Sequence, residues 1–79
     1  MDAASARIME KLVHGALSAA DPLMLWNSPG TGLLCDGCGV GITRSEQEQK
    51  IEMASGRTLR FHVTCHRLWR TLKDTRPKA

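Results

Sequence analysis

The amino-acid sequence predicts a small α+β domain that needs a metal ion or a disulfide to be stable. Its 79 residues are expected to form one domain, residues 1–79, and at this size burial of apolar side chains alone leaves stability marginal. Apolar positions recur at helical spacing near both ends of the chain and alternate singly between them. The expected order is therefore helix, strands, helix, around a core that is thin because aromatic residues are scarce.

Residues 1–26 form the predicted N-terminal helical segment. From residue 3 to residue 20 the apolar positions follow steps of three and four, as on one buried helix face. They are Ile8, Met9, Leu12, Val13, Ala16, Leu17 and Ala20. Pro22 ends this helix, because proline disfavours helical backbone at the residue before it. Leu23–Trp26 is predicted to be a short helical turn, and the run Asn27–Gly32 is rich in turn residues.

Residues 50–61 show the period of two that is typical of strands. Ile51 and Met53 alternate with charged residues, and Leu59 and Phe61 alternate with Thr58 and Arg60 beyond the turn residues 54–57. A β-hairpin is therefore predicted. A competing signal exists, because Ser45 followed by Glu48 matches a helix capping box and would make residues 46–53 helical. The alternation favours strands, since it continues across the turn.

A second amphipathic helix is predicted from Val63 to Leu72. One face would carry the apolar side chains, and the other would carry basic ones. The apolar face comprises Cys65, Leu68, Trp69 and Leu72, and the basic face comprises Arg67, Arg70 and Lys73. Both tryptophans, Trp26 and Trp69, are expected in the core. Residues 74–79 have no large apolar side chain, so a frayed tail is expected.

Four side chains have the spacing of metal ligands. Cys35 and Cys38 are two residues apart with glycines beside them, and His62 and Cys65 form a second pair at the expected start of a helix. Two such pairs present four nitrogen and sulfur ligands, which is what one structural zinc ion accepts. His66 is the alternative to His62, but residues 65 and 66 do not share a helix face. We therefore expect His66 at the surface or behind the ligands.

Three observations predict the cellular compartment. The number of cysteines, three, is odd, which argues against a disulfide framework. No secretory leader pattern precedes the first helix, and no apolar run approaches the roughly 20 residues that cross a bilayer. A cytoplasmic protein is expected, without a membrane partner. Thiols stay reduced there, which favours metal binding over a disulfide framework.

This pattern resembles the treble-clef zinc fingers, and in particular the first zinc module of LIM domains. The similarity covers residues 33–72, where Cys-x2-Cys, a hairpin and His-x2-Cys at a helix start follow in order. The chain is also similar to short bacterial proteins with a Cys-x2-Cys-Gly knuckle and the segment Phe-His-x2-Cys-His-x2-Trp, here Phe61 to Trp69. Unlike a LIM domain, it has no further cysteines for a second zinc module.

Function is predicted only as a class. Four protein ligands leave no open position for a catalytic water, and no nucleophile, base and orienting group fall into a pattern, so no enzyme is expected. An interaction module with a protein partner is the leading hypothesis. Nucleic acid is the alternative, through a group of basic side chains. They are Arg57, Arg60, Arg67, Arg70 and Lys73. A thiol-based redox sensor that releases zinc and self-association through the first helix are further alternatives.

Overall fold

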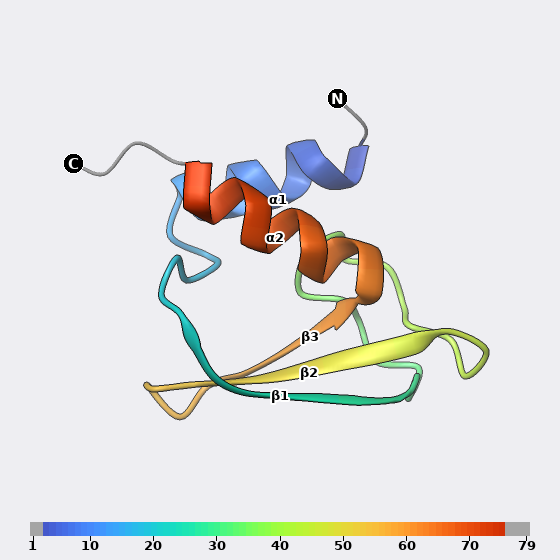
Figure 1. Cartoon of the computed structure of the whole chain (residues 1–79). Coiled ribbons are helices and arrows are strands. Elements are labelled where there is room, and N and C mark those ends of the chain that lie inside the picture. Colours follow the sequence, from blue (N-terminus) through green and yellow to red (C-terminus); the bar gives the residue numbers. More distant parts are fainter. Residues whose placement is uncertain (1–2, 76–79) are drawn as a thin grey trace.

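Two helices and three strands make up the part of the chain that the structure describes. The computed structural model describes residues 3–75. The elements are, in order, α1 (Ala3–Val13), β1 (Pro22–Pro29), β2 (Gln47–Met53), β3 (Thr58–His62) and α2 (Val63–Thr75). The strands form one antiparallel sheet in the order β1-β2-β3, and both helices lie on one side of it (Figure 1). The predicted α+β class is confirmed.

The first helix is shorter than predicted. α1 buries Ile8 and Leu12 as expected, but it ends at Val13, which is mostly exposed. Gly15 follows with a φ of 76°, a left-handed conformation that commonly terminates helices, and its N–H donates to the Leu12 carbonyl at 3.3 Å. The prediction of helix up to residue 20 is therefore wrong, because Gly15 acts as a helix terminator rather than as a tolerated interior residue.

The segment predicted as a helical turn and loop is a strand. β1 pairs with β2 from Met24 opposite Glu52 to Pro29 opposite Gln47. Short apolar runs do not distinguish helix from strand by period, so the pairing with β2 decides the structure. Trp26 lies on this strand and is 41% exposed, so the prediction that it belongs to the core is wrong.

The hairpin prediction is confirmed. Ile51 on β2 faces Leu59 on β3, and Gly56 in the connecting turn has a φ of 87°. The helical alternative for residues 46–53 is wrong. The capping signal is displaced by two residues: Glu46 Oε1 accepts hydrogen bonds from the Thr43 N–H and hydroxyl, both at 3.0 Å. This contact closes a turn that leads into β2.

The second helix carries the largest buried side chain. Trp69 is fully buried, stacks on Phe61 with ring centroids 5.3 Å apart, and donates its indole N–H to the Ser18 carbonyl at 2.9 Å. α2 continues to Thr75, so the expected fraying does not begin at Asp74. The rest of the predicted tail, residues 76–79, lies outside the described residues.

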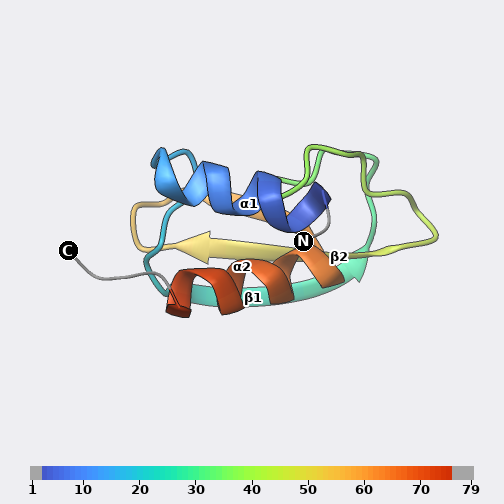
Figure 2. The ribbon, with the colours of Figure 1, turned by 90° about the horizontal axis from the view of Figure 1, so that it is seen from above.

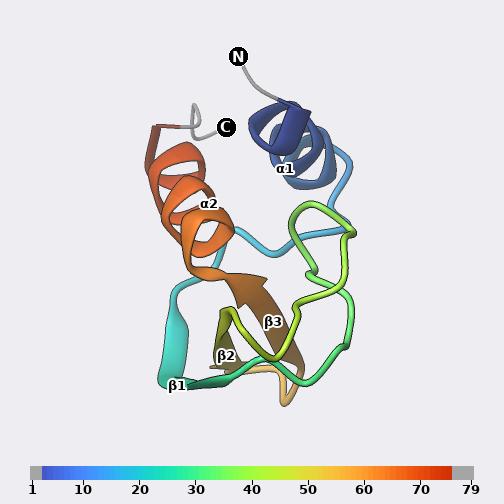
Figure 3. The same cartoon turned by 90° about the vertical axis from the view of Figure 1, so that its right-hand side faces the viewer.

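Two layers of structure bring distant segments to one end of the molecule. α2 packs on β2 and β3, whereas α1 packs on α2 and, within residues 3–75, its backbone approaches none of the strands closely (Figure 3). The two helices run in the same direction, as the view from above shows (Figure 2). The connection 30–46 returns below α1, next to the junction of β3 and α2 (Figure 3). None of the helices within residues 3–75 is long and apolar enough to cross a membrane.

Candidate metal centre

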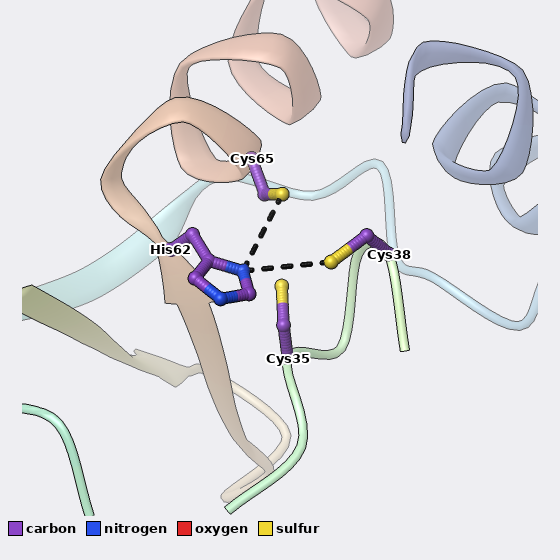
Figure 4. Close-up of side chains that lie close together, drawn as sticks. All are labelled: Cys35, Cys38, His62 and Cys65. Atoms are coloured by element: carbon purple, nitrogen blue, oxygen red, sulfur yellow. Dashed lines mark hydrogen bonds between the residues drawn. The ribbon is translucent and has the colours of Figure 1, made fainter. Parts of the chain in front are cut away.

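The four predicted metal ligands converge at the junction of β3 and α2. Cys35 and Cys38 come from the connection between β1 and β2, His62 is the last residue of β3, and Cys65 lies in the first turn of α2. Their ligand atoms all lie within 4.8 Å of one another, and their side chains point at one common centre (Figure 4). The four side chains are therefore positioned to hold one metal ion.

A tight turn presents the first two thiols. Leu34 and Gly41 form a bridge across the turn, and the Cys35 N–H donates to the Val40 carbonyl at 2.9 Å. Gly39 has a φ of 79°, which lets its N–H donate back to the Cys35 carbonyl at 2.9 Å. The backbone thus holds its shape through its own hydrogen bonds.

Gly37 lies at the closest approach in this turn. Its N–H donates to Cys35 Sγ at 3.3 Å, a contact that stabilises a thiolate. A Cβ at this position would come within 3.2 Å of Cys65 Cβ and of two Ile8 side-chain carbons. A glycine therefore allows α1, the turn and α2 to meet at one point.

His62 has one ring nitrogen in the cluster and one outside it. Nδ1 lies 3.4 Å from Cys38 Sγ and 3.8 Å from Cys65 Sγ. Nε2 lies 3.3 Å from the Gly41 carbonyl oxygen and 3.6 Å from Glu46 Oε1. The tautomer protonated on Nε2 donates to Gly41 and leaves Nδ1 free to ligate, which is the usual arrangement behind a metal-bound histidine.

The cluster of thiols is unfavourable for negative charge unless a cation is present. Burial, and then the nearby Cys35 thiol, raise the pKa of Cys65 above its usual range. A metal ion at the centre reverses this effect, because thiolates rather than thiols coordinate metals. The arrangement is thus suited to a bound cation.

Two basic side chains of α1 reach the cysteine turn, and the sequence analysis did not single them out. Arg7 Nη1 donates to the Cys38 carbonyl at 2.8 Å, and Lys11 Nζ donates to the Asp36 carbonyl at 2.9 Å. Their spacing of four residues places them on one helix face, but nothing in the sequence indicates what that face contacts. They connect α1 to the candidate centre.

Asp36 connects the same turn to the sheet. Its N–H donates to the Arg60 carbonyl and its Oδ2 accepts from the Arg60 N–H, both at 2.7 Å. The turn is therefore hydrogen-bonded to the outer edge of β3, close to His62. This contact fixes the distance between the two ligand pairs.

His66 is buried and is not one of the four converging side chains. It is 7% exposed, and its ring lies 5.9 Å from that of Trp69 and 6.1 Å from that of Phe61. The prediction that it lies at the surface is wrong, because it packs against the buried rings of Phe61 and Trp69. Burial, and then the charge of Arg70, lower the pKa of His66, so the neutral ring is favoured.

The five predicted cations do not share one environment. Arg60 lies 3.6 Å from the buried Glu48 carboxylate, and Lys73 pairs with Asp21 at 2.8 Å. Arg67 and Arg70 line a groove beside α2. The cations thus fall into groups with different contacts instead of one continuous basic surface.

Comparison with models of protein families, with curated proteins and with solved structures gives no match for this chain.

Proposed function

We propose that this chain is a structural zinc domain that serves as an interaction module for a protein partner. The observation that carries the proposal is the combination of a closed four-ligand cluster with an exposed apolar strand. The bound metal would stabilise the fold, and the exposed strand offers an apolar surface that a partner can bury. Resemblance to treble-clef zinc fingers supports the same class.

The donor set and its spacing favour zinc. Three sulfurs and one imidazole nitrogen are a common structural zinc set. In a tetrahedral site, Zn–S of about 2.3 Å and Zn–N of about 2.0 Å place each sulfur about 3.5 Å from the nitrogen. The Nδ1 atom of His62 lies 3.4 Å and 3.8 Å from two of the sulfurs. These two sulfur–nitrogen distances match a zinc site.

A structural role fits the site better than a catalytic one. A catalytic zinc keeps one position for water or substrate, whereas here four side chains supply all four positions. Cys35, Cys38 and Cys65 are each at most 9% exposed, which limits access of a substrate. We therefore propose that the protein is not an enzyme at this site.

The exposed strand favours a protein partner. Four consecutive apolar residues of β1 are 41–65% exposed, on both faces of the strand, and exposed apolar side chains gathered on a small domain commonly mark interaction sites. They are Leu23, Met24, Leu25 and Trp26. Aromatic and methionine side chains are enriched at the centres of protein interfaces.

The test is a pull-down with zinc-loaded protein from its own cell extract, with and without nuclease. A protein partner is expected to remain after nuclease treatment and to be lost after chelation of the metal. Partners that disappear with nuclease would instead support the nucleic-acid alternative, which rests on Arg67 and Arg70, the two cations of the groove beside α2.

A redox sensor is the second candidate, because three thiols share one cluster. Peroxide would take two electrons from two cluster thiolates, which join as a disulfide, while the peroxide takes up two protons and leaves as two water molecules. The metal would lose two ligands. Burial of the sulfurs opposes this chemistry. Zinc release at low peroxide doses, measured with a chelating dye, would favour the sensor.

A further inference from the structure

The two outer strands of the sheet differ in how their edges are protected. The outer edge of β3 is closed at Arg60, whose N–H and carbonyl both bond to Asp36. β1 forms the other edge and, among the described residues 3–75, pairs only with β2. An unprotected edge exposes backbone donors and acceptors on which a further strand can form.

The hydrogen-bond pattern identifies which residues of β1 face outwards. Gly30 N–H donates to the Glu46 carbonyl at 2.9 Å, in the same register as β1 and β2. Backbone groups alternate along an antiparallel ladder, so those of Trp26 and Ser28 point to β2. Leu25 and Asn27 therefore turn their N–H and carbonyl groups to the free edge.

The middle of the free edge lacks the usual deterrents to strand addition. β1 has the sequence PLMLWNSP, with no charged side chain along eight residues. Edge strands are commonly protected by charges, bulges or prolines. Pro22 and Pro29 limit the length of the exposed ladder, and a bulge lies between Pro22 and Met24. The outward-facing backbone of Leu25 and Asn27 has neither protection.

A groove runs along this edge between β1 and α2. It has a volume of about 350 Å³ and is lined by Leu25 and Gln49 of the sheet and by His66, Arg67 and Arg70 of α2, among others. α2 lies above β1 in two views at right angles (Figures 2 and 3). A strand added to β1 would therefore have α2 along one of its faces.

The charges that line this groove are net positive, because Arg67 and Arg70 outnumber the one carboxylate, Asp74. In residues 3–75, no carboxylate lies within ion-pair distance of Arg67 or Arg70. Asp74 is itself paired with Lys73 at 3.2 Å, and Lys73 also pairs with Asp21 at 2.8 Å. The two arginines thus supply a positive potential that an acidic ligand would neutralise.

The charges also argue against a second copy as the occupant. Antiparallel pairing of β1 with β1 of another copy would form one continuous sheet with both α2 helices on the same side. Arg67 and Arg70 of both copies would then face the same groove, where like charges repel. An acidic partner would instead neutralise the positive charge of Arg67 and Arg70.

We infer that the free edge of β1 binds an extended acidic peptide as a fourth strand. The peptide main chain pairs with Leu25 and Asn27, its acidic side chains face Arg67 and Arg70, and its alternate apolar side chains pack on the opposite face. Met24 and Trp26 lie on that opposite face, because side chains alternate along a strand. This inference rests on the proposed function, since it specifies the chemistry of the protein partner.

The first test uses synthetic peptides and zinc-loaded full-length protein. An eight-residue peptide that alternates Val and Glu matches the length of β1, and one that alternates Val and Lys is its control. Calorimetry should show at least about tenfold tighter binding of the Val/Glu peptide, and the difference should shrink as salt is raised. Equal affinity of the two peptides, or no binding of Val/Glu at millimolar concentration, overturns the inference.

Backbone methylation tests strand addition directly. In an added strand, all Glu N–H groups point to one side and all Val N–H groups point to the other. Methylating the nitrogens of one residue type should abolish binding of the peptide, while methylating those of the other type should leave it bound. If both methylated peptides bind as well as the parent, the peptide does not pair with β1.

Substitutions in the groove have a matched control. Arg67→Gln with Arg70→Gln should weaken Val/Glu binding about tenfold, since two exposed ion pairs with the peptide are lost. Arg67→Glu with Arg70→Glu should favour the Val/Lys peptide. Arg44→Gln removes a charge from an exposed position that does not line the groove and should change nothing. Equal losses for the groove variant and for Arg44→Gln overturn the inference.

The inference and the proposed function can fail separately. If a nuclease-resistant protein partner is recovered equally by the native chain and by the Arg67→Gln, Arg70→Gln variant, the interaction module stands but the site on β1 is wrong. If no protein partner is recovered and the Val/Glu peptide does not bind, both are wrong. Circular dichroism and zinc content of each variant verify that it is folded.

Discussion

Two neighbouring residues at the start of α2 show how position decides chemistry. Cys65 points into the cluster of metal ligands, whereas His66 points into the apolar core beside Trp69. Helix geometry explains the difference, because consecutive residues are about 100° apart around the axis. The ligand His62 precedes Cys65 by three residues, at the end of β3, and its Nδ1 lies 3.8 Å from Cys65 Sγ.

The ligand assignment gives the first prediction. Replacing Cys35, Cys38 or Cys65 with Ser, or His62 with Ala, should lower metal affinity by more than the roughly 10–100-fold that loss of an outer-sphere partner costs. His66→Leu, which keeps most of the buried volume, should retain one metal ion per chain. Elemental analysis after dialysis against a competing chelator measures both. Retention by His62→Ala together with loss by His66→Leu would reverse the assignment.

Lys73 gives a prediction about pH. The hydrogen bond to Asp21, and in addition the one to Asp74, raise the pKa of Lys73. Its folded-state pKa thus exceeds its unfolded value, so its contribution is complete below about pH 10.4 and falls as pH rises through the raised value. Lys73→Met should lower the free energy of unfolding at pH 7 by up to about 1 kcal/mol, because Asp21 is largely exposed.

Urea denaturation of both proteins at increasing pH checks this sign. The difference in the free energy of unfolding between the native chain and Lys73→Met should become smaller as the pH rises above about 10.4. A difference that grows with pH would contradict the assigned direction. Added salt should also narrow it at pH 7, since the pair is partly screened.

At the scale of elements, the sequence predicts local periodicity well and distant pairing poorly. α2 and the hairpin are confirmed because their patterns are long and each depends on neighbouring residues. β1 is missed because its partner, β2, lies about twenty residues away and only that pairing makes it a strand. Exposure of Trp26 follows from the same pairing, since it places the residue on the face opposite α2.

The connection between α1 and the cysteine turn gives the third prediction. Arg7 and Lys11 donate to the carbonyls of Cys38 and Asp36, and both contacts are partly buried. Replacing both with Met keeps the apolar stems and removes the donors, which should lower the free energy of unfolding by about 1–3 kcal/mol. Glu10→Gln, on the exposed face of the same helix, is the control and should change stability little.

Chemical denaturation monitored by helical circular dichroism measures this effect. The double variant should also release its metal to a chelator faster, because the turn that holds Cys35 and Cys38 loses its support from α1. Equal stability of the double variant and of Glu10→Gln would mean that α1 is held by Ile8 and Leu12 alone.

At the scale of the whole molecule, the cluster lies where all the distant segments meet. The cysteine turn touches α1 through Gly37, β3 through Asp36 and α2 through the shared ligand set. The spacing of the ligands could be predicted from the sequence, because zinc geometry constrains it. The contacts of α1 with the turn could not, since they depend on how the chain folds back after Gly15.

Metal removal should therefore unfold more than the segment that binds it. Binding energy at a structural zinc site is folding energy, on the order of 10 kcal/mol in small zinc peptides. Without the metal, α1 loses the turn that Arg7 and Lys11 contact, and an isolated helix of 11 residues is marginal in water. Circular dichroism after strong chelation should show loss of both helices, and adding zinc back should restore them. Trp69 fluorescence should report exposure of the core in the same titration, with Trp26→Phe as the background that isolates its signal. A helical spectrum that survives when elemental analysis finds no metal would mean that the core, thin as it is, holds the fold by itself.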